Sequence, residues 1–314
     1  MPRFALIALG AGTVSALLHF AAMSSWMFGI PLALFTQLPL FLVGLGYGTR
    51  AVAYAGGAGV VLTGLIAGLF AALNFAVVDA VPVALVVFQA LRSRTGPDGE
   101  VDWYPLGSLV MWLTVYAAAV LVLASILLSG AEGGMEGVLR DLFVDTRQDL
   151  TGTPVNPQIE ATIDALVPML PGFALTMWML VVAVNGALAQ TILVRNGRNL
   201  RPSPDLAGLA LPNWMTIAVA AACVVAFLGP DTLDFIGQNL ALVLAVPFFF
   251  SSLALVHMLV RRSTNRGVIL VLFYALLVFS LMMMEWRAIV PVAALGLISH
   301  LANLRRRFGG PGQA

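Results

Sequence analysis

Long apolar runs recur along the whole chain and leave little room for any other kind of segment. A helix that spans a membrane needs about 20 mostly apolar residues, and such runs follow one another here with short polar breaks between them. Only 10% of the 314 residues are charged, against about 25% in a typical soluble domain. Because hydrocarbon cannot hydrogen-bond the backbone, each run must satisfy its own polar groups. We therefore predict an all-α, polytopic transmembrane helix bundle.

The breaks between the runs predict about 8–10 spanning helices in a single integral membrane domain, 1–314. Several runs are short for a full crossing, so eight crossings with one re-entrant or kinked pair is the alternative to ten. The first run exceeds the roughly 7–15 residues of a signal-peptide core, and we expect it to be retained. The ten candidate helices cover residues 4–23, 31–48, 51–72, 75–91, 107–129, 169–194, 213–228, 236–260, 267–284 and 288–304.

The arginines alternate from side to side along this threading. All 16 basic residues are arginine, and short cytoplasmic loops collect basic residues while translocated loops do not. With the N-terminus inside, thirteen arginines fall in cytoplasmic segments and three, Arg140, Arg147 and Arg287, fall on the opposite side. This sidedness predicts a multi-pass protein of the bacterial cytoplasmic (inner) membrane with both termini in the cytoplasm.

The longest polar stretch, 130–167, is acidic and falls on the predicted non-cytoplasmic side. Apolar residues such as Met135, Leu139 and Phe143 recur in it at helical spacing, opposite the charges. We expect two short amphipathic helices on the membrane face. Because their acidity disfavours anionic lipid headgroups, docking against the protein's own helices is the first interpretation, and capture of an external partner is the second.

The chain carries none of the common catalytic signatures, such as a phosphate-binding loop, HExxH, CxxC or GxSxG. His19, His257 and His300 lie on three different predicted helices, with no carboxylate at metal-ligand spacing beside them. The single cysteine, Cys223, lies inside an apolar run and cannot form a disulfide within the chain. We expect a protein that is not an enzyme, with no cofactor, no metal site and no nucleic-acid partner.

Polar side chains near the predicted outer ends of several helices form the candidate ligand site. Ionisable residues inside spanning helices are costly to bury and are functional candidates for that reason. We expect them to line an outward-open pocket; solvated turn charges, a helix cap or an arginine-paired aspartate would explain the same residues. The candidate ligand-binding residues are Asn74, Asp79, Glu285, Trp286 and Arg287.

Small residues are spaced by four along the first predicted helix, at Ala8, Gly12 and Ala16. Such rows allow two helix backbones to approach closely in lipid. A similar row, which includes Ala55 and Gly59, follows in the third helix. These rows predict helix docking, either inside the chain or against another membrane subunit.

Six segments carry a resemblance to a known family. They read QLPLFLVGLGYG (37–48), DGEVDWYPLGSLVMW (98–112), LPGFALTMWMLVVAVNGALAQ (170–190), RPSPDLAGLALPNW (201–214), PFFFSSLALVH (247–257) and GLISHLANLRRR (296–307). They resemble the alphaproteobacterial branch of an uncharacterised bacterial membrane family, domain of unknown function 2232. Residues 1–92 are also similar, at the level of fold, to the substrate-binding subunits of energy-coupling-factor transporters and to the rod-shape protein MreD, while 107–304 form the C-terminal helices.

The resemblance and the residues together favour a transport-associated or substrate-binding membrane subunit for a small solute. Since the sequence offers no nucleotide site, energy would come from a partner ATPase or an ion gradient, and the few intramembrane charges are sparse for a proton pathway. The alternative is a non-catalytic scaffold that recruits envelope or division proteins. Expected partners are the lipid bilayer and, through the small-residue rows, a second membrane subunit.

Overall fold

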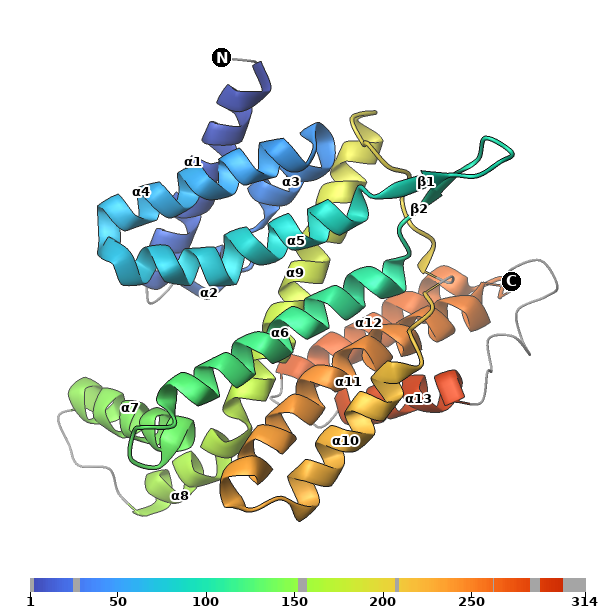
Figure 1. The fold of residues 1–314 in the computed structure, drawn as a ribbon. Helices are drawn as coiled ribbons and strands as arrows, with labels where there is room; N and C mark the ends of the chain where they lie inside the picture. The colour runs from blue at the N-terminus through green and yellow to red at the C-terminus, as the bar shows by residue number, and fades with distance from the viewer. Residues whose placement is uncertain are drawn as a thin grey trace. The chain divides into compact units, whose positions relative to one another are not determined.

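A computed structural model gives the fold of the chain and describes residues 3–24, 29–151, 157–206, 209–261, 263–282 and 289–301. Every predicted apolar run is helical in it, as one helix or as two in succession (Figure 1). The elements are α1 (Arg3–Ser24), α2 (Gly29–Ala33), α3 (Leu38–Tyr47), α4 (Thr49–Phe75), the π-helix η1 (Ala76–Ala80), α5 (Val81–Ala90), β1 (Ser93–Thr95), β2 (Val101–Trp103), α6 (Leu106–Leu128), α7 (Gly134–Thr151), α8 (Pro157–Leu166), the 3₁₀-helix η2 (Val167–Met169), α9 (Leu170–Arg195), α10 (Trp214–Leu228), α11 (Asp231–Val260), α12 (Arg266–Met282) and α13 (Ile289–Leu301).

The helices have the length and surface of membrane-spanning segments. Within the described ranges, five helical stretches are long and apolar enough to cross a membrane: Phe4–Ser24, Thr49–Ala90, Leu106–Leu128, Pro157–Arg195 and Leu233–Val260. Large apolar side chains point outward from them, as at Phe70 and Leu65, which are 79% and 80% exposed. Such a surface is stable against hydrocarbon and not against water. The predicted class, an all-α polytopic membrane bundle, is confirmed.

The chain forms two compact units. Unit 1 contains residues 1–113 and 178–205, and unit 2 contains residues 114–177 and 206–314. The division passes through α6 and α9, each of which contributes to both units. Unit 1 therefore combines the N-terminal helices with the second half of α9, which lies in the C-terminal part of the sequence.

The third and fourth predicted helices meet at a different residue from the one expected. A break between residues 72 and 75 was predicted, but the chain reverses at Gly68, whose φ of 87° is in the left-handed region that favours glycine. The chain then stays helical from Leu69 to Ala90, with the π-helical turn η1 between α4 and α5 (Figure 1). A Cβ at Gly64 would lie 3.2 Å from Ala72, so the two arms of this hairpin pack closely. As a result, Asp79 lies halfway along the second arm and not at its outer end.

Small residues let α1 pack tightly against α4 within unit 1. A Cβ on Gly12 would overlap the backbone carbonyl of Ala55, and one on Gly59 would lie 3.3 Å from the backbone carbonyl oxygen of Gly12. Ala8 and Ala16 are buried on either side of Gly12. The small-residue row of the first helix is therefore occupied inside the chain, where its backbone approaches that of α4.

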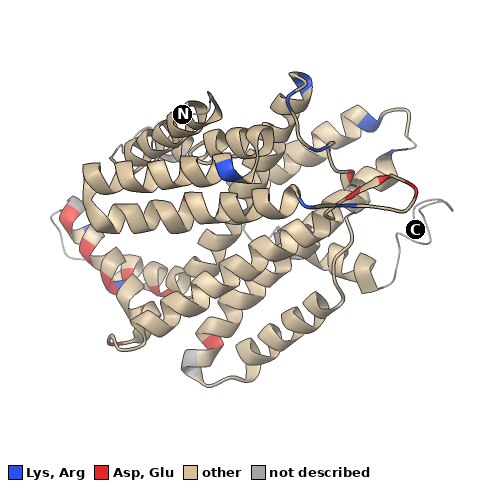
Figure 2. Ribbon diagram, turned by 45° about the horizontal axis from the view of Figure 1, so that its top comes forward, with Lys and Arg blue, Asp and Glu red and all other residues tan. Residues whose placement is uncertain are grey.

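The arginine-bearing segments of unit 1 gather at one end of its helices. The β1–β2 hairpin, not predicted from the sequence, pairs Arg94 with Asp102 across the strands. The loop after α9 docks beside it: Arg201 Nη1 donates a hydrogen bond of 2.8 Å to the Ala90 carbonyl at the end of α5, and its guanidinium lies 5.8 Å from the centre of the Trp103 ring. Burial lowers the pKa of Arg201. Figure 2 shows the arginines of these segments at loops and helix ends.

Unit 2 is built around α11, which packs against α10 and α13 through glycines. A Cβ on Gly237 would lie 2.5 Å from the α10 backbone. The acidic stretch forms α7 and α8, as predicted, and Arg140 links them by hydrogen-bonded ion pairs to Asp164 at 2.7 Å and Glu160 at 2.8 Å. These two carboxylates raise the pKa of Arg140. Figure 2 shows the acidic residues along α7.

Candidate intramembrane polar site

The second predicted helix is interrupted in the middle. Residues 34–37 form a turn between α2 and α3, because Pro39 has no N–H with which to continue the helical ladder. The break leaves backbone carbonyls that hydrocarbon cannot satisfy. Asn185 Nδ2 of α9 donates a hydrogen bond of 2.7 Å to the carbonyl of Leu34, and Ser15 Oγ of α1 donates one to the carbonyl of Thr36. Side chains of two neighbouring helices therefore satisfy the interruption.

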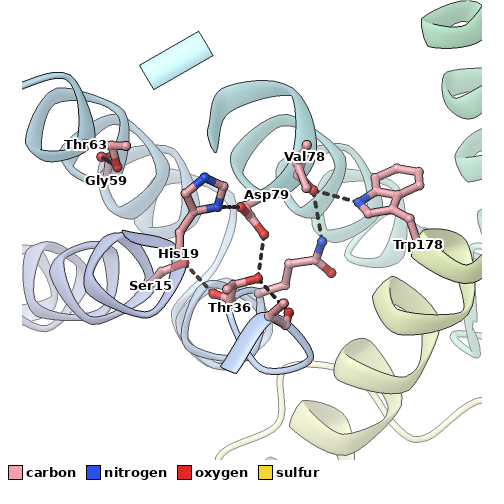
Figure 3. A network of polar contacts seen from close by, with 10 residues as sticks. Ser15, His19, Thr36, Gly59, Thr63, Val78, Asp79 and Trp178 are labelled. Atoms are coloured by element: carbon pink, nitrogen blue, oxygen red, sulfur yellow. Dashed lines mark hydrogen bonds and ion pairs between the residues drawn. The ribbon is translucent and has the colours of Figure 1, made fainter. Parts of the chain in front are cut away.

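A second interruption lies opposite, where the π-helix η1 meets α5. Pro82 lacks the N–H that would bond to the carbonyl of Val78, four residues earlier. Two side chains take its place: Gln37 Nε2 and Trp178 Nε1 each donate a hydrogen bond of 2.9 Å to Val78 O. Figure 3 shows both bonds meeting at the carbonyl. Single π-helical turns are rare and occur often at functional sites.

Asp79 belongs to η1, at the second interruption, and is completely buried. Its Oδ2 is 2.7 Å from Nδ1 of His19 on α1, and its Oδ1 accepts a hydrogen bond of 2.7 Å from Thr36 Oγ1 (Figure 3). His19 and Thr36 are only 6% and 5% exposed. Among the described residues this is the one ion pair whose two members are both buried. We call Ser15, His19, Thr36, Gln37, Asp79 and Trp178 the polar cluster.

Nε2 of His19 has no hydrogen-bond partner among the residues that the structure describes. Nδ1 faces the carboxylate, so the proton of a neutral imidazole belongs on Nδ1 and leaves Nε2 with a lone pair. Nε2 is buried, and no described group hydrogen-bonds to it; the edge-to-face ring of Phe75 lies 5.4 Å away, centre to centre. The cluster therefore keeps one polar atom without a described partner away from water.

The predicted site residues have separate fates. Asp79 is the centre of the polar cluster, although its complete burial does not fit the outward-open pocket that was expected. Asn74 is half-buried in the same helix and forms none of the hydrogen bonds described for the cluster. Glu285, Trp286 and Arg287 lie outside the described residues. Ala8, Gly12 and Ala16 lie on α1, the helix that carries His19, on the side that packs against α4.

Sequence reasoning missed His19, Thr36, Ser15 and Trp178 as members of the site. His19 was set aside because no carboxylate lies near it in sequence, yet Asp79, 60 residues away, is its partner. Two features could have indicated the pairing. Ionisable residues within apolar spans seek one another in a low-dielectric interior, and both Thr36 and Asp79 lie three residues before a proline. Groups of three or more His, Cys, Asp or Glu that could hold a metal are absent from the described ranges.

Comparison with known proteins agrees with the membrane class. Residues 13–298, which include the whole polar cluster, match the family described as "Predicted membrane protein (DUF2232)". No curated protein and no solved structure matches the chain. The match extends over nearly all of the sequence and includes the second half of α1 and the whole of every other helix that contributes to the cluster. The chain therefore belongs to the DUF2232 family of predicted membrane proteins.

Proposed function

We propose that this protein is a transport-associated membrane subunit that binds a small polar solute at the polar cluster of unit 1. The observation that carries the proposal is the buried His19–Asp79 pair between two interrupted helices. Charged residues and irregular backbone are costly within a membrane. In transporters, discontinuous helices supply the backbone and side-chain groups that hold substrates and ions near the bilayer midplane.

The chemistry of the cluster defines the class of solute. Its acceptors are the Asp79 carboxylate and the carbonyl of Val78, and each is now occupied by donors from the protein. A solute with amine, amide or hydroxyl donors would replace His19 or Gln37 at these atoms. Because Asp79 is completely buried here, the described conformation is the closed one. Access of a solute to Asp79 would require movement of the 34–37 turn. Because this turn is not part of a continuous helix, its movement would break no continuous ladder of helical hydrogen bonds.

A thermal-shift screen tests the proposal. The protein is reconstituted in lipid nanodiscs and its unfolding is followed by tryptophan fluorescence with a panel of small amines, amides and polyols. We expect at least one class of solute to stabilise the wild type and to lose its effect in Asp79→Asn, which keeps the size of the side chain. Asp98→Asn, in the exposed β-hairpin, is the matched control. Stabilisation that is equal in Asp79→Asn and the wild type would refute the proposal.

The second candidate is a non-catalytic scaffold. It is favoured by the internal satisfaction of Asp79, which accepts from both His19 and Thr36, and by the exposed charged hairpin of residues 93–103. In that case the hairpin would bind cytoplasmic partners. Affinity purification of wild type and of a hairpin variant, Arg94→Gln, separates the two functions: partner loss in the variant supports the scaffold, and unchanged partners argue against it.

A further inference from the structure

A groove on unit 1 lies between α1, α3 and the end of α9, and no residue of the polar cluster lines it. Its volume is about 660 Å³, within the usual range of small-molecule sites, about 300–1,000 Å³. The walls are apolar along most of its length, with Ile7 and Val14 on α1 and Leu42 on α3. From Ile7 to Val14 the α1 wall extends roughly 10 Å at 1.5 Å per residue, somewhat less than one leaflet of a hydrocarbon core about 30 Å thick.

One end of the groove is polar and carries a positive charge. Tyr47, Asn196 and Arg198 line it there, at the arginine-bearing end of unit 1. Arg198 is exposed, and of the carboxylates that the structure describes none forms an ion pair with it. An apolar channel that ends in an unpaired guanidinium matches an amphipathic anion, with its chain along the groove and its charged group at the arginine.

The position of Arg198 is fixed by the way α9 ends. Its N–H donates a hydrogen bond of 2.9 Å to the carbonyl of Leu193, and the N–H of Gly197 donates one of 3.1 Å to Val194. With Gly197 at a φ of 63°, these two bonds are the Schellman termination of a helix. The helix end therefore presents Arg198 at the mouth of the groove in a defined geometry, unlike an arginine on an unstructured tail.

We infer that this groove is a binding site for an anionic phospholipid. One acyl chain lies along α1 and α3, and the phosphate binds the guanidinium of Arg198. The lipid, and not a soluble phosphate, is the occupant because the apolar wall makes up most of the groove. Basic pockets between membrane helices bind anionic headgroups by the same charge complementarity. The inference goes beyond the proposed function, since it uses none of the residues of the polar cluster.

Gly10 provides a direct way to fill the groove. It lines the wall, and a Cβ placed on it meets no described atom within 4 Å. Gly10→Phe therefore enters the groove without disturbing the packing of α1 on α4. Gly57→Phe is the matched control, because Gly57 is exposed on α4, does not line the groove, and also leaves room for a Cβ. Arg198→Gln removes the charge, and Arg94→Gln in the exposed hairpin is its control.

The experiment compares binding of phosphatidylglycerol and phosphatidylcholine with identical acyl chains to the full-length protein in detergent, measured by native mass spectrometry. We expect the wild type to bind phosphatidylglycerol more tightly than phosphatidylcholine. Arg198→Gln should lower the affinity for phosphatidylglycerol roughly fivefold, because this is the contribution of one arginine near an anionic membrane surface. Gly10→Phe should weaken both lipids, and both control variants should match the wild type.

Three results would overturn the inference. The first is equal affinity of the wild type for the two lipids. The second is an effect of Arg198→Gln no larger than that of Arg94→Gln. The third is displacement of phosphatidylglycerol by millimolar inorganic phosphate, which would identify a soluble anion site in place of a lipid site. Thermal unfolding of each variant without added lipid shows whether the protein remains folded.

Discussion

Removing one member of the His19–Asp79 pair should cost more stability than removing both. Asp79→Leu keeps the branched shape of the side chain and replaces both carboxylate oxygens with methyl groups. His19→Leu leaves the carboxylate with Thr36 as its remaining described donor. The two single variants and the double variant form a double-mutant cycle that isolates the interaction between the two side chains.

The magnitude follows from the burial of the pair. His19→Leu removes a donor from Asp79, which is completely buried, and breaking a buried pair in this way costs about 3–5 kcal/mol. Asp79→Leu leaves the donors of His19 and Thr36 without their acceptor, and the loss is smaller, about 1–3 kcal/mol. The double variant replaces the pair with apolar groups, a change that is often close to neutral. We expect a coupling free energy of about 3 kcal/mol or more.

Equilibrium unfolding in mixed micelles, followed by tryptophan fluorescence, gives the free energy of each variant. The exposed cross-strand neighbours Arg94 and Asp102 provide a control cycle, in which the coupling should be about 0–1 kcal/mol. If the His19–Asp79 losses add to within about 0.5 kcal/mol, the two side chains do not interact in the folded protein and the argument for the polar cluster is wrong.

Three further predictions concern packing, a buried arginine and the acidic helices. Gly12→Ala should destabilise the protein by about 1–3 kcal/mol in thermal unfolding, because a Cβ there overlaps the α4 backbone, while Gly10→Ala should have little effect. Arg201→Leu should increase hydrogen exchange at the end of α5 and in the loop after α9, because it removes the hydrogen bond that joins them; unchanged exchange would contradict this. Arg140→Gln should increase exchange in α7 and α8 by removing their ion pairs. Because its two carboxylate partners raise the pKa of Arg140, the stabilisation by its ion pairs is complete below the ordinary pKa of an arginine side chain and is lost only as the pH rises through the raised pKa. Wild-type protection in α7 and α8, corrected for intrinsic rates, should therefore be constant between about pH 6 and 9.

The helices themselves were predictable from the sequence because each depends on a local run of residues. The apolar runs correspond to α1, α6, α9 and the others within a few residues, and the spacing of Met135 and Leu139 predicted α7. Membrane helices must satisfy their own backbone, so local composition carries most of the information about them. The β1–β2 hairpin lies outside this rule, because it is a short polar segment stabilised by pairing.

Breaks within the helices were harder to predict. The boundary between two helices was predicted between residues 72 and 75, but the chain turns at Gly68, which is surrounded by apolar residues and differs from them in its freedom to adopt a positive φ. The position of Asp79 depends on this turn. Its partner His19 comes from a helix 60 residues earlier, a contact set by tertiary packing that no local pattern contains.

The central position of Asp79 also bears on how the protein is made. A helix with an aspartate at its midpoint enters the bilayer from the translocon less favourably, by about 2.5–3.5 kcal/mol. Its partner on α1 has already been synthesised by then, and α1 packs directly on the arriving hairpin through Gly12. We therefore expect α1 to aid insertion of the hairpin formed by α4, η1 and α5, and ribosome-bound chains that lack α1 should integrate residues 69–90 less efficiently.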